Sequence, residues 1–231
     1  MKRISAAVTT ILLPGVAYAA VVALTDRVFW DTSVPPGKKQ RAALAIRDNV
    51  IPFQKWGSKQ FTTPYLDRSY GTAWYFTQTD SEDCKQAFLA RLNEALQRYS
   101  VVDLFLLAHG NQFILWVAEL PPQQRRRIRL VYNTGCRDLK QGPAWLQLGA
   151  RAYVGHPGDS ASPVFYFYFL RRWTRGATLR EVIDESNGLM CSTLARAEFS
   201  SFGVLDASRV SQESEAFCYG DGGLQLQGNG D

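Results

Sequence analysis

The chain has 231 residues, of which 46% are hydrophobic, 13% aromatic and 20% charged, and its formal net charge is +5. A chain this long and this apolar can bury a sizeable core, which excludes intrinsic disorder and small disulfide-stapled scaffolds. The positive charge is spread thinly and is not interleaved with aromatic residues, so nucleic-acid binding is not expected.

The first 24 residues have the pattern of an export signal. Lys2 and Arg3 precede the uncharged residues 4–24, and Ala17-Tyr18-Ala19 supplies an A-x-A cleavage pattern. An uncleaved membrane anchor is the alternative, since about 20 apolar residues can span a bilayer. With either alternative the rest of the chain is exported, so we expect a periplasmic or secreted body that is tethered if the segment stays uncleaved.

The remaining chain is predicted to contain one folded domain. Residues 25–68 are expected to be a linker and an N-terminal helical segment, because Pro35-Pro36-Gly37 and Lys38-Lys39 are typical of a linker. Residues 69–231 are expected to form the α/β domain, with no internal repeat.

Strands and helices are predicted to alternate along this domain. The β-branched and aromatic residues 72–78 favour a strand, and the nearly continuous apolar run 101–108 is typical of a strand covered on both faces. Two more strands are expected at 128–132 and 150–154, with helices after Asp80, around 144–146, over 162–175 and from 179. This alternation predicts a mostly parallel sheet with helices on both faces, a three-layer α/β sandwich.

Candidate functional residues follow three of these strands. The second strand ends in His109-Gly110, the third leads into Thr134-Gly135-Cys136, and the fourth ends in Gly155-His156. Open α/β sheets bind ligands at the carboxyl ends of their strands. Both histidines of the chain and one cysteine are therefore expected at a single edge of the sheet.

Cys136 is the candidate nucleophile at that edge. A thiol in a turn can attack a carbonyl carbon, and His109 could protonate the leaving amine. The N–H groups of Gly110 and Cys136 could bind the oxyanion, where losing one donor typically costs about 3 kcal/mol. The alternative is a buried structural thiol beside a histidine that caps a strand.

The other cysteines and charges suggest structural roles. No two cysteines form a C-x-x-C pair, so a structural zinc site is not expected, and Cys191 with Cys218 is the favoured disulfide pair. Asp103, inside the apolar strand, is interpreted as a core carboxylate with satisfied hydrogen bonds. The run of arginines at 125–127, together with Arg129, is interpreted as a solvated face before a strand.

The order of these motifs resembles the caspase-like (clan CD) cysteine peptidases, nearest their bacterial CHAT-type and gingipain-like branch. The matching segments are L-F-L-L-A-H-G at 104–110, R-L-V-Y-N-T-G-C-R-D at 129–138 and G-A-R-A-Y-V-G-H at 149–156. The resemblance covers residues 70–225. It implies a caspase-like three-layer sandwich.

The resemblance also implies a Cys–His dyad that hydrolyses a peptide bond in a peptide or protein substrate, without a cofactor or metal. Cys136 would be the nucleophile, His109 the general acid and base, and Gly110 part of the oxyanion hole. Only 27 residues separate the two dyad positions, against roughly 50 in the caspase branch.

Three further residues are candidates for a substrate pocket: Thr134, His156 and Asp138. Thr134 stands where caspases have glutamine, so cleavage after aspartate is not implied. His156 could equally be a turn residue and Asp138 an ordinary loop charge. A catalytically inactive scaffold or interaction module outside the cytoplasm is the alternative function, and a small-molecule thiol hydrolase is a third.

Overall fold

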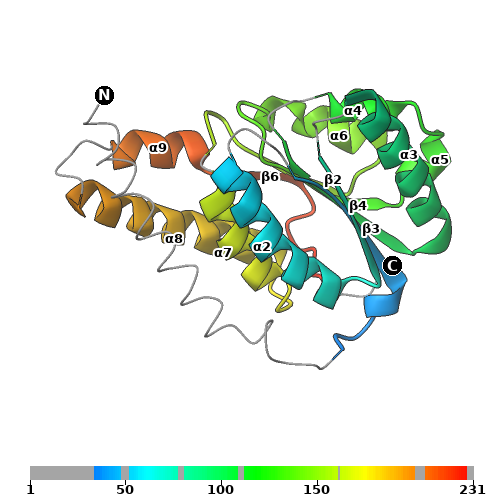
Figure 1. Cartoon of the computed structure of the whole chain (residues 1–231), viewed down its shortest axis with the longest axis horizontal. Helices are drawn as coiled ribbons and strands as arrows, with labels where there is room; N and C mark the ends of the chain where they lie inside the picture. The colour runs from blue at the N-terminus through cyan, green and yellow to red at the C-terminus, as the bar shows by residue number, and fades with distance from the viewer. Residues whose placement is uncertain are drawn as a thin grey trace.

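The computed structural model describes residues 34–47, 52–77, 81–108, 112–160, 162–200 and 206–227 (Figure 1). The expected export segment 1–24 lies outside these ranges. Within them, no helix combines the length and the apolar character needed to cross a membrane.

A six-stranded sheet forms the middle layer, in the order β2-β1-β3-β4-β5-β6. Neighbouring strands are parallel except for β6, which runs antiparallel to β5 at one edge. The strands are β1 (Arg41–Arg47), β2 (Thr72–Phe76), β3 (Val101–Leu107), β4 (Ile128–Asn133), β5 (Ala152–Gly155) and β6 (Phe217–Gly220).

Helices cover both faces of this sheet (Figure 1), which confirms the predicted α/β class. One face packs against α2, α7 and α8, and the other against α3, α4 and α6. The helices are α2 (Pro52–Ser69), α3 (Ser81–Arg98), α4 (Phe113–Ala118), α5 (Pro122–Arg125), α6 (Gly142–Leu148), α7 (Ser162–Trp173), α8 (Leu179–Ser200) and α9 (Ala207–Ser214), with short 3-10 helices η2 (Lys38–Gln40) and η3 (Leu139–Gln141).

Alternation along the strands sorts the core into two apolar layers. In β3, Leu104 and Leu106 point to the layer under α3, whereas Phe105 and Leu107 point to the layer under α7. Every residue of β3 is buried, as the continuous apolar run predicted. The four predicted strands and the helices between them are all present.

Residues 25–68, expected to be a linker and an N-terminal helical segment, do contain a helix, but part of the expected linker is a strand. Residues 41–47 form β1, which lies between β2 and β3 in the sheet, and residues 52–69 form α2. The division predicted at residue 69 therefore cuts through the fold. The sequence does not predict this strand, R-A-A-L-A-I-R. A short alanine-rich run that is buried on both faces lacks the alternation of apolar and polar residues that indicates a strand.

All four cysteines lie in the described part of the chain, and none is joined to another by a disulfide. The predicted pair is therefore not formed: Cys191 is exposed on α8, and Cys218 is half-buried on β6.

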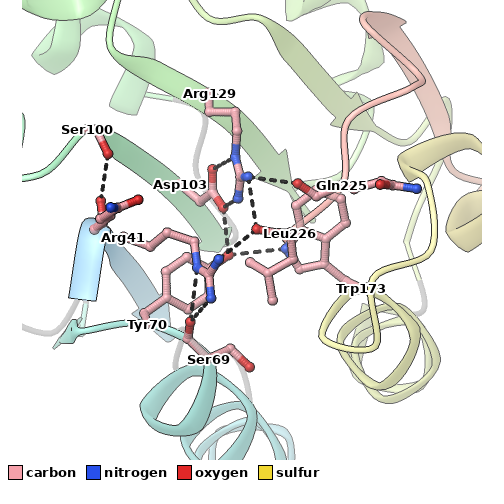
Figure 2. A network of polar contacts seen from close by, with 10 residues as sticks. Arg41, Ser69, Tyr70, Ser100, Asp103, Arg129, Trp173, Gln225 and Leu226 are labelled. Carbon is pink, nitrogen blue, oxygen red and sulfur yellow. Dashed lines mark hydrogen bonds and ion pairs between the residues drawn. The ribbon is translucent and has the colours of Figure 1, made fainter. Parts of the chain in front are cut away.

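A network of buried polar contacts closes the amino-terminal edge of the sheet (Figure 2). Asp103 is fully buried, and its carboxylate accepts hydrogen bonds from two guanidinium nitrogens of Arg129 and, at 2.6 Å, from the hydroxyl of Tyr70. The Trp173 indole N–H donates to the same hydroxyl at 3.1 Å. The interpretation of Asp103 as a satisfied core carboxylate is thus confirmed.

Arg129 corrects the interpretation of the arginine run. A β-bulge shifts the register of β3 and β4 between Val102 and Asp103, so that Arg129 is the extra residue on β4 and lies beside Asp103. Arg126 and Arg127 are exposed, as expected. Arg129 also donates to the carbonyl of Gln225 at 2.9 Å, which ties the C-terminal segment to the sheet.

Candidate functional site

The carboxyl ends of β3 and β4 lie side by side. Leu106 of β3 pairs with Asn133 of β4, and the next N–H along, from Thr134, donates to the Leu106 carbonyl at 3.0 Å. The chain therefore leaves both strands at the same edge of the sheet. His109 and Gly110 follow β3 within three residues, but they lie outside the described residues.

A tight turn at residues 133–138, here called the Cys136 turn, follows β4. The Asn133 side-chain oxygen accepts the Gly135 N–H at 3.0 Å, which closes the start of the turn. Arg137 has a φ of 59°, in the left-handed region that costs a non-glycine residue about 1–3 kcal/mol. Cys136 lies between them with its side chain half-buried, so the thiol is held on a defined turn near the surface.

A second turn at residues 156–160, here called the β5 turn, supports the first. The Arg137 N–H donates to the Gly158 carbonyl at 2.9 Å, and the Leu139 N–H donates to the His156 carbonyl at 3.0 Å. The Arg137 guanidinium also lies 3.4 Å from a carboxylate oxygen of Asp159, between two exposed side chains. These contacts compensate for the strained backbone of Arg137.

The Asp138 side chain is fully buried beneath the Cys136 turn. Its Oδ1 accepts the backbone N–H of His156 at 2.9 Å, and its carbonyl accepts the Tyr153 hydroxyl at 2.9 Å. Oδ2 has no hydrogen-bond partner among the described residues. Burial raises the pKa of this carboxyl to about 8, although the N–H of His156 acts in the opposite direction.

Gly155 leaves room for that carboxyl. A Cβ added at this position would lie 2.8 Å from Oδ1 of Asp138 and equally close to the ring of Tyr153. Any other residue would have to displace one of the two, so glycine at the end of β5 is required by the packing of Asp138.

His156 is also fully buried. Its Nδ1 lies 2.8 Å from the carbonyl of Ser214, and because a carbonyl can only accept, Nδ1 carries the hydrogen. Its ring meets Tyr132 edge to face, with centroids 6.0 Å apart. Burial lowers the pKa of His156 to about 4, so the ring is neutral at physiological pH.

The end of α9 holds the β5 turn from outside. The Gly158 N–H donates to the Glu213 carbonyl at 3.0 Å, and the Ser214 hydroxyl donates to the Asp159 carbonyl at 3.2 Å. Together with His156, these bonds fix the β5 turn, which in turn fixes the Cys136 turn. The thiol is thus supported by two successive layers of backbone contacts.

The predicted site residues divide into two groups. Cys136 is half-buried at the surface, whereas Thr134, Asp138 and His156 are buried behind it, with at most 4% of each residue exposed. In this structure these three residues support the turn rather than face a substrate.

Sequence reasoning missed several of the residues that shape this site. Asn133 could have been found, because Asn two residues before Gly is a turn signal. Tyr153 and Ser214 carry no such signal, since each acts through a contact that is distant in sequence.

Among the described residues, no group of three or more His, Cys, Asp or Glu side chains is placed to hold a metal ion. Comparisons of the chain with protein-family models and with curated proteins find no match.

Proposed function

We propose that the protein is an exported cysteine endopeptidase of the caspase-like type, with Cys136 as nucleophile and His109 as general acid and base. The observation that carries the proposal is a half-buried thiol on a rigid turn at the carboxyl edge of the sheet. The neighbouring parallel strand leads directly to His109.

The proposed reaction uses the geometry of that edge. His109 takes the proton of the Cys136 thiol, and the sulfur attacks the carbonyl carbon of the scissile peptide bond. The N–H groups of Cys136 and Gly110 stabilise the negative oxygen that forms. The C–N bond then breaks as His109 protonates the leaving amine. Water, deprotonated by His109, hydrolyses the resulting thioester and releases the acid product and the thiol.

Three features support this assignment over a structural thiol. Cys136 is partly accessible, whereas Cys84 is buried in the core. The turn is fixed by backbone hydrogen bonds on both sides of Cys136, which is what a nucleophile that must not move requires. The motif order around Cys136 and His109 is the one that resembles the caspase-like peptidases.

The proposed substrate is a peptide or protein met outside the cytoplasm. An export signal at residues 1–24 would deliver the body to the periplasm or the medium, and without cleavage residues 4–24 would tether it to the membrane.

A peptide-library cleavage screen on the chain from residue 25 tests the proposal and reports the P1 preference. We expect cleavage by the wild type and none by Cys136→Ala or His109→Ala. Cys191→Ala is the matched control, because Cys191 is an exposed thiol far along the chain, and it should cleave normally.

An electrophilic peptide ketone gives an independent measurement, because it labels an activated thiol without turnover. We expect labelling at Cys136 that is lost in Cys136→Ala. Equal labelling of Cys136 and Cys191, together with no cleavage of any library peptide, would contradict the peptidase and favour the inactive scaffold.

A further inference from the structure

One buried side chain joins the two turns of the candidate site. Through its carboxyl and carbonyl, Asp138 binds His156 in the β5 turn and Tyr153 in β5. The N–H of Gly135, next to Cys136, also stabilises the ionised carboxyl. Asp138 is therefore in contact with all three segments that fix the position of the thiol.

The surroundings of this carboxyl offer little compensation for a negative charge. The titratable groups that face it are Tyr132 of β4, Tyr153 of β5 and His156 of the β5 turn. Burial and the carboxyl itself raise the pKa of both tyrosines, and burial lowers the pKa of His156, so none of the three supplies a positive charge at neutral pH.

The turn itself adds only Cys136 and one cation, Arg137. The Arg137 side chain is 73% exposed and pairs with Asp159 at the surface, away from the interior where Asp138 lies. With a pKa of about 8, Asp138 holds a proton at neutral pH, and the neutral acid is the form that the buried setting favours.

We propose that Asp138 is the positioning residue of Cys136: the protonated carboxyl holds the Cys136 turn on the β5 turn, and its ionisation releases the turn. This inference rests on the proposed function only in making the turn catalytically important. The hold on the turn is a property of the fold and can be measured without substrate.

The release follows from the cost of a buried charge. Once ionised, Asp138 carries a negative charge, one of its oxygens has no hydrogen-bond partner among the described residues, and no cation is among the groups that shift its pKa. Opening the turn to water relieves that cost. Opening also breaks the bonds from the N–H groups of Arg137 and Leu139, and it frees Arg137 from its left-handed backbone.

Amide hydrogen exchange of the turn tests the proposal directly. The chain from residue 25 is pulse-labelled in deuterium oxide from pH 6 to pH 9.5, and the protection of peptides covering residues 134–141 is corrected for the intrinsic exchange rate. In the wild type we expect the corrected protection to fall at least tenfold between pH 7 and pH 9. Peptides from β3 and α3 should keep theirs.

Two substitutions separate the charge from the hydrogen bond. In Asp138→Asn the side-chain oxygen still accepts the His156 N–H but the group cannot ionise, so protection should exceed that of the wild type at pH 7 and change less than twofold from pH 6 to pH 9. In Asp138→Ala the acceptor is lost, and protection should be low at every pH. Asp159→Asn removes an exposed carboxylate near the same turn and should behave as wild type.

Labelling of Cys136 by the peptide ketone links the turn to the thiol. The rate is divided by that of iodoacetamide on Cys191, an exposed cysteine outside the turn. We expect the normalised wild-type rate to fall at least threefold between pH 6 and pH 8, and that of Asp138→Asn to stay constant.

The outcomes distinguish this inference from the proposed function. Protection that is independent of pH in the wild type, or that falls equally in Asp138→Asn, overturns the role of Asp138 even if Cys136 is the nucleophile. The expected protection pattern without any labelling of Cys136 overturns the peptidase and leaves Asp138 as the residue that holds the turn. The wild type and Asp138→Asn suffice for this decision if Asp138→Ala does not fold.

Discussion

Among the residues that the structure describes, two carboxyl groups are completely buried, at opposite edges of the same sheet, and their surroundings differ. Asp103 meets a guanidinium and a hydroxyl, and the arginine that holds it also binds the C-terminal segment (Figure 2). The Asp138 carboxyl accepts the backbone N–H of His156, and no cation is among the groups that shift its pKa. Equal burial therefore does not imply an equal charge.

The difference separates an edge that holds the fold together from the edge at which we propose catalysis. A buried carboxylate with a cation and satisfied oxygens locks strands together at any ordinary pH. A buried carboxyl without such partners has a strongly shifted pKa, and groups of this kind cluster at functional sites. Asp138 lies directly beneath the candidate nucleophile, whereas Asp103 lies at the far end of the strands.

Among the variants considered, removing the Arg129 cation at the amino-terminal edge of the sheet should lower the free energy of unfolding most. Arg129→Met removes the guanidinium that pairs with buried Asp103, and breaking such a pair typically costs about 3–5 kcal/mol. We expect a loss of this size in the free energy of unfolding measured with urea at pH 7. Arg126→Met, an exposed residue of the same run, is the control.

Restoring neutrality should recover part of that loss. In the double variant Asp103→Asn/Arg129→Met both charges of the ion pair are removed together, so it should be more stable than Arg129→Met alone. If Arg126→Met and Arg129→Met lost equal amounts of unfolding free energy, the amino-terminal edge would not depend on the pairing of Asp103 with a cation.

Removing the ionisable carboxyl of Asp138, at the carboxyl-terminal edge of the sheet, should instead raise the free energy of unfolding. The folded pKa of Asp138, about 8, lies above the unfolded value near 4, so the unfolded chain gives up its proton first as pH rises. Wild-type stability therefore loses about 1.4 kcal/mol per pH unit from this group between pH 4 and pH 8, and the loss is complete above pH 8. The Asp138→Asn variant has no carboxyl to titrate at this position, so its unfolding free energy does not fall in this way.

We therefore expect the stability advantage of Asp138→Asn over the wild type to grow by about 5 kcal/mol from pH 4 to pH 8, measured as the difference in unfolding free energy. The exposed control Asp159→Asn should show no such trend. Asp103→Asn should be less stable than the wild type throughout. A constant difference for Asp138→Asn would mean that its carboxyl has an ordinary pKa.

The sequence predicts much of this fold because its signals are local. The apolar run of β3, the turn glycines and the Ser-Pro start of α7 each identify an element without knowledge of its neighbours. β1 was missed because its alanines give no periodic signal, and only its place between β2 and β3 makes it a strand. Its burial is a property of the assembled sheet.

The candidate site was predictable as a location but not as an arrangement. Strand ends placed Cys136 and His156 at one edge, which follows from the direction of parallel strands. That His156 is buried against the end of α9, and that Asp138 lies inside the turn, depends on contacts between residues 18 to 58 positions apart. The β-bulge that turns Arg129 inward is equally invisible in the sequence.

The smallest effect concerns the pH profile, in which Asp138 and His156 act against each other. His156 has a folded pKa of about 4, below the unfolded value near 6.5, so only the unfolded chain binds its proton between these values. Its contribution to stability is complete above pH 6.5 and is lost as pH falls toward 4, while that of Asp138 grows over the same interval. In the wild type the two slopes nearly cancel.

In His156→Asn, the change of unfolding free energy with pH should reflect Asp138 without the opposing contribution of His156. Its side-chain amide can donate to the Ser214 carbonyl as Nδ1 does, but it cannot titrate. Relative to its own value at pH 6.5, the variant should be more stable than the wild type by about 1 kcal/mol at pH 5.5, from urea unfolding at both values. The double variant with Asp138→Asn should return to a flat profile, because both opposing groups are then gone. Identical profiles in all three proteins would mean that neither buried group titrates abnormally, and the contrast between the two edges would then rest on hydrogen bonding alone.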